Sequence, residues 1–124
     1  MTAKLLLLTL ISVSLSAAAQ IALKAGMSGP KVVTALASGD QRAMILAAAG
    51  SPYVALGLAL YAFGAVVWLA VLSRVDVSVA YPFVGLGFLL TTAWAALFLG
   101  ENVNLVRLIG TGMIAAGICL VAQS

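Results

Sequence analysis

The stretch Leu5–Lys24, LLLLTLISVSLSAAAQIALK, decides how this chain folds. As an α-helix, residues 5–23 would be roughly 29 Å long, which is close to the thickness of the hydrocarbon core of a bilayer. Side chains three or four residues apart stack on one face of a helix. Five polar residues have this spacing: Thr9, Ser12, Ser16, Gln20 and Lys24. The stretch therefore predicts a membrane-spanning helix that carries one polar stripe.

The polar stripe has two interpretations. Polar groups are costly in hydrocarbon and tend to face protein or a water-filled cavity, so the stripe suggests that this helix lines a cavity. Serine also bonds to its own helix backbone or lets helices pack closely, and this is the alternative for Ser12 and Ser16. Gln20 needs partners for its amide. Lys24, at the helix end, fits a side chain that extends to the lipid headgroups.

The composition is typical of a membrane protein. The chain has 124 residues, of which 65% are hydrophobic and 7% charged, so we expect one domain without a large soluble part. The net charge is +3, and the basic residues form no cluster, which favours anionic lipids over nucleic acid as partners. The single cysteine, Cys119, is predicted to be a small core residue. We expect no enzymatic activity, cofactor or metal.

The N-terminal segment also resembles a secretory signal. Lys4, the leucine run and the small residues Ala17–Ala19 match its charged, apolar and cleavage regions. However, the apolar run continues to Leu23, which gives it spanning length, and the downstream sequence is also apolar. We therefore expect the segment to be retained as a helix.

Three further apolar stretches predict an all-α bundle of four transmembrane helices, forming a single domain over residues 1–124. Ser51-Pro52 is a helix-start signal, with serine as the cap and proline at the first position. Pro82 falls within the first turns of the third helix and is expected to kink it. The predicted spans are about 5–23, 52–72, 79–99 and 104–122.

The segment between the first two spans is less apolar. Gly26, Gly29 and Pro30 break the first helix, and Asp40 has the position of a cap for a second short helix. We predict that residues 31–50 form one or two short helices at the membrane surface. A plain ordered loop is the alternative.

The third helix offers a second candidate lining surface. Tyr81, Gly85, Phe88 and Thr92 lie roughly on one of its faces. Close helix packing is the favoured role of Gly85 and Gly87.

The fourth helix is predicted to be a packing or dimerisation helix. Thr111 with Ala115, and Gly112 with Ala116, form pairs of small residues four apart that let helices approach closely. Four helices about 10 Å across would fill a nearly solid bundle. We therefore expect a substrate pathway to need a second copy or a related partner subunit.

Several short motifs resemble the small multidrug resistance superfamily and its drug/metabolite transporter relatives. The likeness covers nearly the whole chain except residues 28–51, and it implies a chain of four helices whose subunits work in pairs. It rests on Ser16–Lys24 in the first helix, Val79–Pro82 and Phe98–Glu101 around the third, and Ile109–Gly117 in the fourth.

Two departures separate this chain from the drug-exporting branch. Where that branch has a membrane-buried Glu, this chain has Ser16, and where it has a Trp in the third helix, this chain has Val84. Without a buried carboxylate, a proton antiporter of that type lacks its exchange site. The chain looks more like the small subunits that flip aminoarabinose-phosphoundecaprenol, and this likeness rests on Gln20, Lys24, Tyr81, Pro82 and Glu101.

Three functions follow from this reading. The first is a flippase subunit of the bacterial inner membrane that moves an anionic, undecaprenyl-phosphate-linked sugar. The alternative is a small drug or metabolite exporter, and the third is a membrane subunit that only stabilises a partner. The candidate substrate-binding residues are Ser12, Ser16, Gln20, Lys24, Arg74, Tyr81, Pro82 and Glu101.

The basic residues also predict an orientation in the membrane. Four spans place both termini on one side, with Lys4 and Arg74. The other side has four basic residues and this side has two, so the positive-inside rule places the other side in the cytoplasm. That side holds Lys24, Lys31, Arg42 and Arg107.

Overall fold

The computed structural model describes residues 2–124, and all of its regular elements there are helices. Four apolar helices are long enough to cross a membrane when α5, η1 and α6 are taken as one span, Val77–Phe98. This confirms the predicted four-helix membrane architecture. The elements are α1 (Ala3–Met27), α2 (Pro30–Ser38), α3 (Gln41–Ala49), α4 (Pro52–Leu72), α5 (Val77–Ala80), the 3₁₀ helix η1 (Tyr81–Phe83), α6 (Val84–Phe98) and α7 (Leu105–Gln123).

The helix starts are fixed by local capping. Ser51 accepts a hydrogen bond from the Val54 amide and precedes Pro52, the first residue of α4. Asp40 caps α3 in the same manner, and Asn104 caps α7. These side chains satisfy amide groups that the first helical turn leaves free. The capping predictions for Ser51 and Asp40 are confirmed, and the segment between the first two spans is two short helices.

Pro82 changes the start of the third span. It lies in the 3₁₀ turn Tyr81–Phe83, between α5 and α6. Proline has no amide hydrogen and its ring crowds the preceding turn, so the regular α-helical bonding is interrupted there. The predicted irregularity at Pro82 is confirmed, and it rotates the residues of α6 relative to a straight helix.

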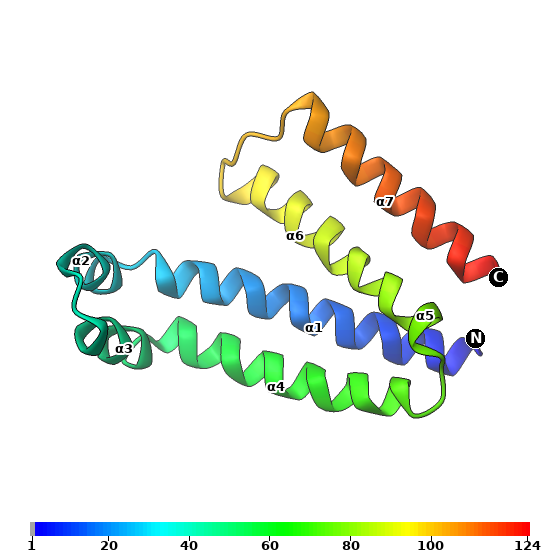
Figure 1. The fold of residues 1–124 in the computed structure, drawn as a ribbon, viewed down its shortest axis with the longest axis horizontal. Coiled ribbons are helices and arrows are strands. Elements are labelled where there is room, and N and C mark those ends of the chain that lie inside the picture. The colour runs from blue at the N-terminus through cyan, green and yellow to red at the C-terminus, as the bar shows by residue number, and fades with distance from the viewer. Residues whose placement is uncertain (1) are drawn as a thin grey trace.

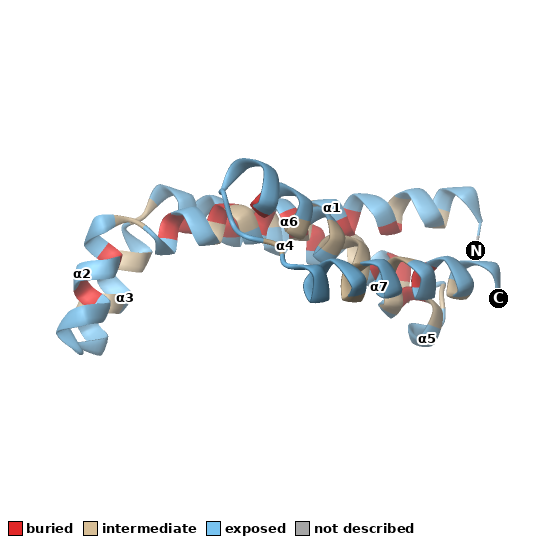
Figure 2. Ribbon diagram, turned by 90° about the horizontal axis from the view of Figure 1, so that it is seen from above, coloured by how far each residue is buried: buried red, intermediate tan, exposed pale blue. Residues whose placement is uncertain are grey.

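The tightest contact in the chain is between α1 and α4, which lie antiparallel and side by side (Figure 1). Three buried glycines, Gly26, Gly57 and Gly64, mark this seam. A Cβ added at Gly57 would lie 2.8 Å from Leu23 Cγ, so the missing side chain is what permits the approach. Small residues at such positions let membrane helices approach closely. Buried residues accordingly concentrate along α1 and α4 in Figure 2.

The other two spans pack more loosely. The share of buried residues falls from 28% in α1 to 6% in α7. In α7 the one buried residue is Ile118, which lies against α6 at Gly85. The expectation of a nearly solid bundle is wrong for the described chain, because α6 packs on α1 and α7 but makes few contacts with α4, and α7 packs mainly on α6 and η1.

Both termini lie at the same end of the molecule, as four spans require (Figure 1). The α2–α3 pair and the α6–α7 loop lie at the opposite end. The basic residues are therefore divided between the two ends as the sequence predicts, with the larger group at the α2–α3 end. Which end faces the cytoplasm stays a prediction.

Candidate functional site

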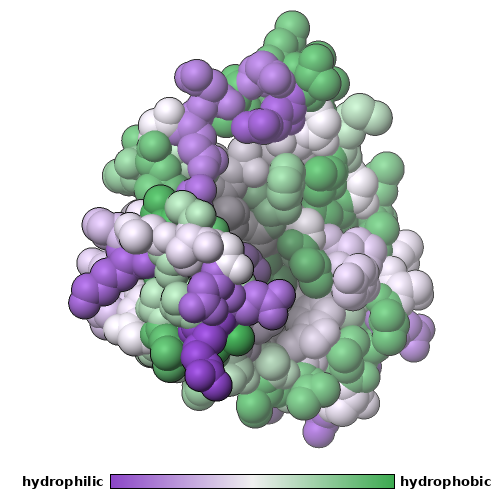
Figure 3. All heavy atoms as spheres, turned by 60° about the vertical axis from the view of Figure 1, so that its left-hand side comes forward, coloured by the Kyte–Doolittle hydropathy of each residue, from purple (hydrophilic) through white to green (hydrophobic). Residues whose placement is uncertain are grey.

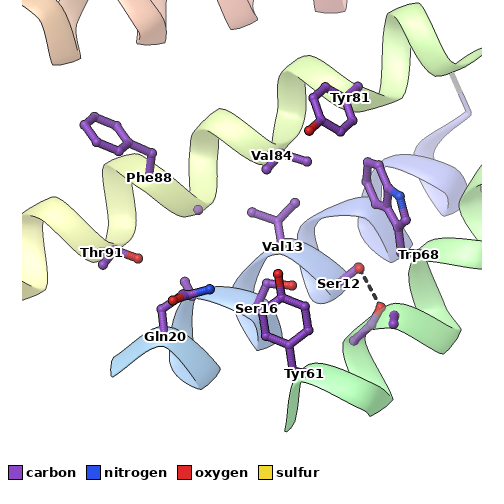
Figure 4. A pocket seen from close by; sticks show the side chains of 14 residues that line it. Ser12, Val13, Ser16, Gln20, Tyr61, Trp68, Tyr81, Val84, Phe88 and Thr91 are labelled. Atoms are coloured by element: carbon purple, nitrogen blue, oxygen red, sulfur yellow. Dashed lines mark hydrogen bonds between the residues drawn. The ribbon is translucent and has the colours of Figure 1, made fainter. Parts of the chain in front are cut away.

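A cavity of about 480 Å³ lies between α1, α4 and α6. It is half open and predominantly apolar, with a few hydroxyl and amide groups. Figure 4 shows side chains from all three helices converging on it. The lining residues are Ser12, Val13, Ser16, Ala17 and Gln20 from α1; Tyr61, Gly64, Ala65 and Trp68 from α4; and Tyr81, Val84, Gly87, Phe88 and Thr91 from η1 and α6.

The polar stripe of α1 divides into a packing part and a lining part. Thr9 is fully buried and donates to the Leu5 carbonyl oxygen at 2.8 Å. Ser12 is 2% exposed and donates to the Gly64 carbonyl oxygen at 2.8 Å, so it ties α1 to α4 at the edge of the cavity. Both interpretations of the stripe therefore hold, at different positions along the helix.

Ser16 and Gln20 form the lining part. Within residues 2–124, no hydrogen bond ties either side chain to another protein group, and both border the cavity. In Figure 4 the Gln20 amide points toward the cavity, and the Ser16 side chain overlaps the ring of Tyr61 in this view. A hydroxyl and an amide that are free of protein partners can bond to a ligand.

Aromatic side chains make up much of the remaining wall. Tyr61 and Trp68 come from α4, seven residues apart and hence on one face. Tyr81 and Phe88 face them from the other side (Figure 4). Tyr61 is a lining residue that was not predicted from the sequence. The signal was the spacing of Tyr61, Gly64 and Trp68, which places both aromatic rings beside the glycine that contacts α1.

The lining face of α6 differs from the predicted one. Tyr81 and Phe88 line the cavity as expected, but Val84 and Thr91 accompany them in place of Gly85 and Thr92. Gly85 lies against α7, where an added Cβ would meet Ile114 and Ile118 at 3.0 Å. The 3₁₀ turn at Pro82 offsets the helical phase, which explains the shift by one residue. Close packing, the favoured role of Gly85, agrees with this contact.

Four of the candidate substrate-binding residues lie outside the cavity. Lys24 is exposed in the last turn of α1, one turn beyond Gln20. Arg74 is exposed in the turn after α4. Pro82 shapes the 3₁₀ turn, and Glu101 is exposed in the α6–α7 loop. The structure thus brings together Ser12, Ser16, Gln20 and Tyr81.

The proposed dimerisation residues lie on the weakly packed helix. Gly112 and Ala116 are exposed, and an added Cβ at Gly112 would meet nothing within 4 Å. Thr111 and Ala115 are half-buried, and Thr111 donates to the Arg107 carbonyl oxygen. This face is therefore available to another helix, and dimerisation stays a prediction.

The chemistry of the cavity is that of uncharged recognition. Among the described residues that line it, none is acidic or basic. Hydroxyl and amide groups bond to polar ligand atoms, and aromatic faces stack on apolar faces or attract cations. Such a cavity is suited to holding a polar, uncharged or weakly charged group inside the membrane.

Comparison with known families decides the class of this protein. The model of the EamA-like transporter family matches residues 4–123. The chain belongs to the EamA-like transporter family. This EamA-like chain is a multi-pass membrane transporter rather than an enzyme, in agreement with the four apolar spans.

Curated relatives are similar over part of the chain. The "Probable 4-amino-4-deoxy-L-arabinose-phosphoundecaprenol flippase subunit ArnE" of Pseudomonas savastanoi pv. phaseolicola is 38% identical over 74 residues, 60% of this chain and 65% of the relative. The same-named subunits of Pseudomonas aeruginosa (strain LESB58) and Yersinia pestis (strain Pestoides F) are 38% identical over 60% of this chain and 34% identical over 56%. These matches cover 64% and 61% of the two relatives. The chain therefore matches less than two thirds of the length of these relatives. No solved structure matches the chain.

Proposed function

We propose that this transporter is a subunit of a flippase that moves an undecaprenyl-phosphate-linked sugar of the aminoarabinose type across the bacterial inner membrane. The observation that carries the proposal is the half-open, uncharged cavity between three membrane-spanning helices. The partial similarity to subunits with that described activity supports the choice of substrate.

The lining residues fit an amino sugar. Sugar rings have apolar faces that stack on aromatic side chains and hydroxyls that bond to groups such as Ser16 and Gln20. The 4-amino group, when protonated, would be attracted to the faces of Tyr61, Trp68 or Tyr81 by about 0.5–2 kcal/mol for each such contact. A carboxylate is not required for this recognition.

The helix arrangement also fits a lipid-linked substrate. Both α4 and α6 pack against α1, whereas contacts between α4 and α6 are sparse. The isoprenoid chain would leave the cavity through this gap and remain in the bilayer. Lys24 and Arg74, exposed beyond the two ends of the cavity, would attract the phosphate at either membrane surface.

A second subunit completes the proposed pathway. The open side of the cavity and the unpaired face of α7 would be covered by a homodimeric copy or by a related small subunit. The relatives are themselves described as flippase subunits, which supports an assembly.

The alternative is an exporter of small drugs or metabolites. Its support is the aromatic lining, which would also accept a flat organic cation. A carboxylate-coupled proton exchanger is not supported, because the described lining residues include no acid.

The test is a flipping assay in proteoliposomes that contain this chain, alone or with a related small subunit. We expect the wild type to translocate aminoarabinose-phosphoundecaprenol, and Gln20→Leu and Tyr81→Leu to lower the rate by ten-fold or more. Ser14→Ala is the matched control, because Ser14 is exposed on the face of α1 away from the cavity. Unchanged rates in both cavity variants would refute the site. Proton-linked release of an organic cation, without lipid movement, would favour the exporter.

A further inference from the structure

The α2–α3 hairpin, Pro30–Ala49, contributes none of the residues that line the cavity. It joins the end of α1 to the start of α4, and its two short helices pack on each other. They run across the long axis of the α1–α4 pair: Figure 1 views them nearly end-on, and Figure 2 shows them turned away from that axis. Because α1 and α4 are membrane spans, the hairpin lies at the level where those spans leave the hydrocarbon, roughly parallel to the membrane plane.

Helix α2 has three distinct faces. Val32 and Ala35 are buried inside the protein, at 2% and 9% exposure. Val33 and Leu36 form an apolar face that is about half exposed. The polar face is on the side opposite to this apolar face, as the helical period requires. It consists of Lys31, Thr34 and Ser38.

Helix α3 adds more exposed apolar surface. Ile45 and Leu46 are 64% and 66% exposed. Aliphatic side chains of this size are more stable in an apolar environment than in water. Exposing the four residues Val33, Leu36, Ile45 and Leu46 to water on one small hairpin would be unfavourable. We therefore expect lipid or protein to cover them.

The basic residues at this end of the molecule favour lipid as the cover. Lys31 and Arg42 lie on the hairpin, and Lys24 lies in the last turn of α1. The acidic residue of the hairpin, Asp40, is engaged as the cap of α3. Hydrophilic residues gather over this end of the molecule in Figure 3, with apolar residues on its flanks. An apolar face next to basic side chains is complementary to an anionic lipid surface and not to a bare hydrophobic partner.

We propose that the α2–α3 hairpin is an interfacial anchor that inserts Val33, Leu36, Ile45 and Leu46 into one leaflet and holds anionic phospholipid headgroups with Lys24, Lys31 and Arg42. The polar face of α2 remains in water. The anchor fixes the depth of α1 and α4 in the bilayer, and it enriches anionic lipid beside the cavity end at Gln20. It does not depend on the identity of the transported substrate.

The insertion is tested by labelling two positions on opposite faces of α2. In a Cys119→Ser background, Leu36→Cys and Thr34→Cys each carry one environment-sensitive fluorophore on the full chain. The protein is reconstituted in vesicles of phosphatidylethanolamine and phosphatidylglycerol. We expect the label at position 36 to be quenched by shallow doxyl lipids and shielded from iodide. The label at position 34 should be quenched by iodide and not by shallow doxyl lipids.

Two outcomes would overturn the anchor. Equal quenching of both labels by iodide would place the hairpin in water. Shielding of the label at position 36 from iodide and doxyl lipid alike would show that protein covers the face.

The proposed contact between basic residues and anionic headgroups is tested by native mass spectrometry of the protein released from the same vesicles. Lys31→Gln with Arg42→Gln should lose at least half of the retained phosphatidylglycerol. Lys4→Gln, at the opposite end of α1, is the matched control and should retain it. Equal retention in both variants would refute the headgroup contact.

Discussion

The two halves of this transporter are packed to different degrees. Between α1 and α4, glycines let the backbones approach so closely that a methyl group at Gly26 would meet Val54 Cγ2 at 2.5 Å. In α7, by contrast, Gly110, Gly112 and Gly117 have nothing within 4 Å of an added Cβ. Glycine therefore permits a tight helix–helix contact between α1 and α4, whereas the glycines of α7 lie on an open surface.

This difference indicates that the α1–α4 pair and the α6–α7 pair have different roles. The α1–α4 pair is a closely packed scaffold that places Ser16, Gln20 and Tyr61 beside the cavity. The α6–α7 pair is held by few contacts, so it is the side on which we expect a partner subunit to add packing. Apolar helix faces have no hydrophobic incentive to pair in lipid, and association there depends on close fit.

The largest effect is expected from filling the scaffold seam. Gly57→Leu would force side-chain atoms against Leu23 and the Ala19 carbonyl oxygen, which an added Cβ would already approach to 2.8 Å and 3.1 Å. Overpacking of this kind costs about 1–3 kcal/mol or more. We expect a clear loss of thermal stability in detergent, or no folded protein. A variant as stable as the wild type would show that the seam is loose.

The same substitution on α7 should act on assembly instead. At Gly112 an added Cβ would meet none of the described residues within 4 Å, so we expect the folded Gly112→Leu monomer to be about as stable as the wild type. If this face pairs with another subunit, the larger side chain should weaken the assembly by about 1–3 kcal/mol. The measurement is the subunit stoichiometry in nanodiscs over a range of dilutions. A wild-type chain that is active as a monomer would contradict the predicted dimer.

Ser16 lies on the boundary between the two halves. The Ser16→Glu variant tests whether its side chain faces the cavity or a packed helix interface. A charged group against a packed interface costs about 2.5–3.5 kcal/mol in a membrane helix. Since Ser16 borders the cavity, we expect a smaller loss of stability. We also expect a new affinity for hydrophobic cations that disappears when the carboxylate is protonated at low pH. A stable variant that binds no cation at any pH would refute the accessible cavity.

The smallest effect concerns the hydrogen bond across the seam. Ser12→Ala removes the bond to the Gly64 carbonyl oxygen. Such bonds between membrane helices average about 0.6 kcal/mol, so we expect a small decrease in the free energy of unfolding. Ser14→Ala, on an exposed face of α1, is the control and should show no decrease.

Much of this fold follows from the sequence alone. The length and apolar character of the four spans determine a membrane protein, because backbone polar groups in lipid must be satisfied within a helix. Their ends follow from local chemistry, as at Ser51-Pro52 and Asp40, where a side chain bonds to an amide two or three residues away. The polar stripe of α1 also points to the lining role of Ser16 and Gln20.

Only the tertiary structure decides which faces meet. Trp68 lies near the end of an apolar span and lines the cavity, because Gly64 on the same face packs on α1. The lining face of α6 depends on the rotation that Pro82 introduces, which spacing along a regular helix does not include. Ser12 and Ser16 have the same chemistry, yet one lies opposite the Gly64 carbonyl and the other borders the cavity. These outcomes depend on where a neighbouring helix ends up, and that is a property of the packed molecule.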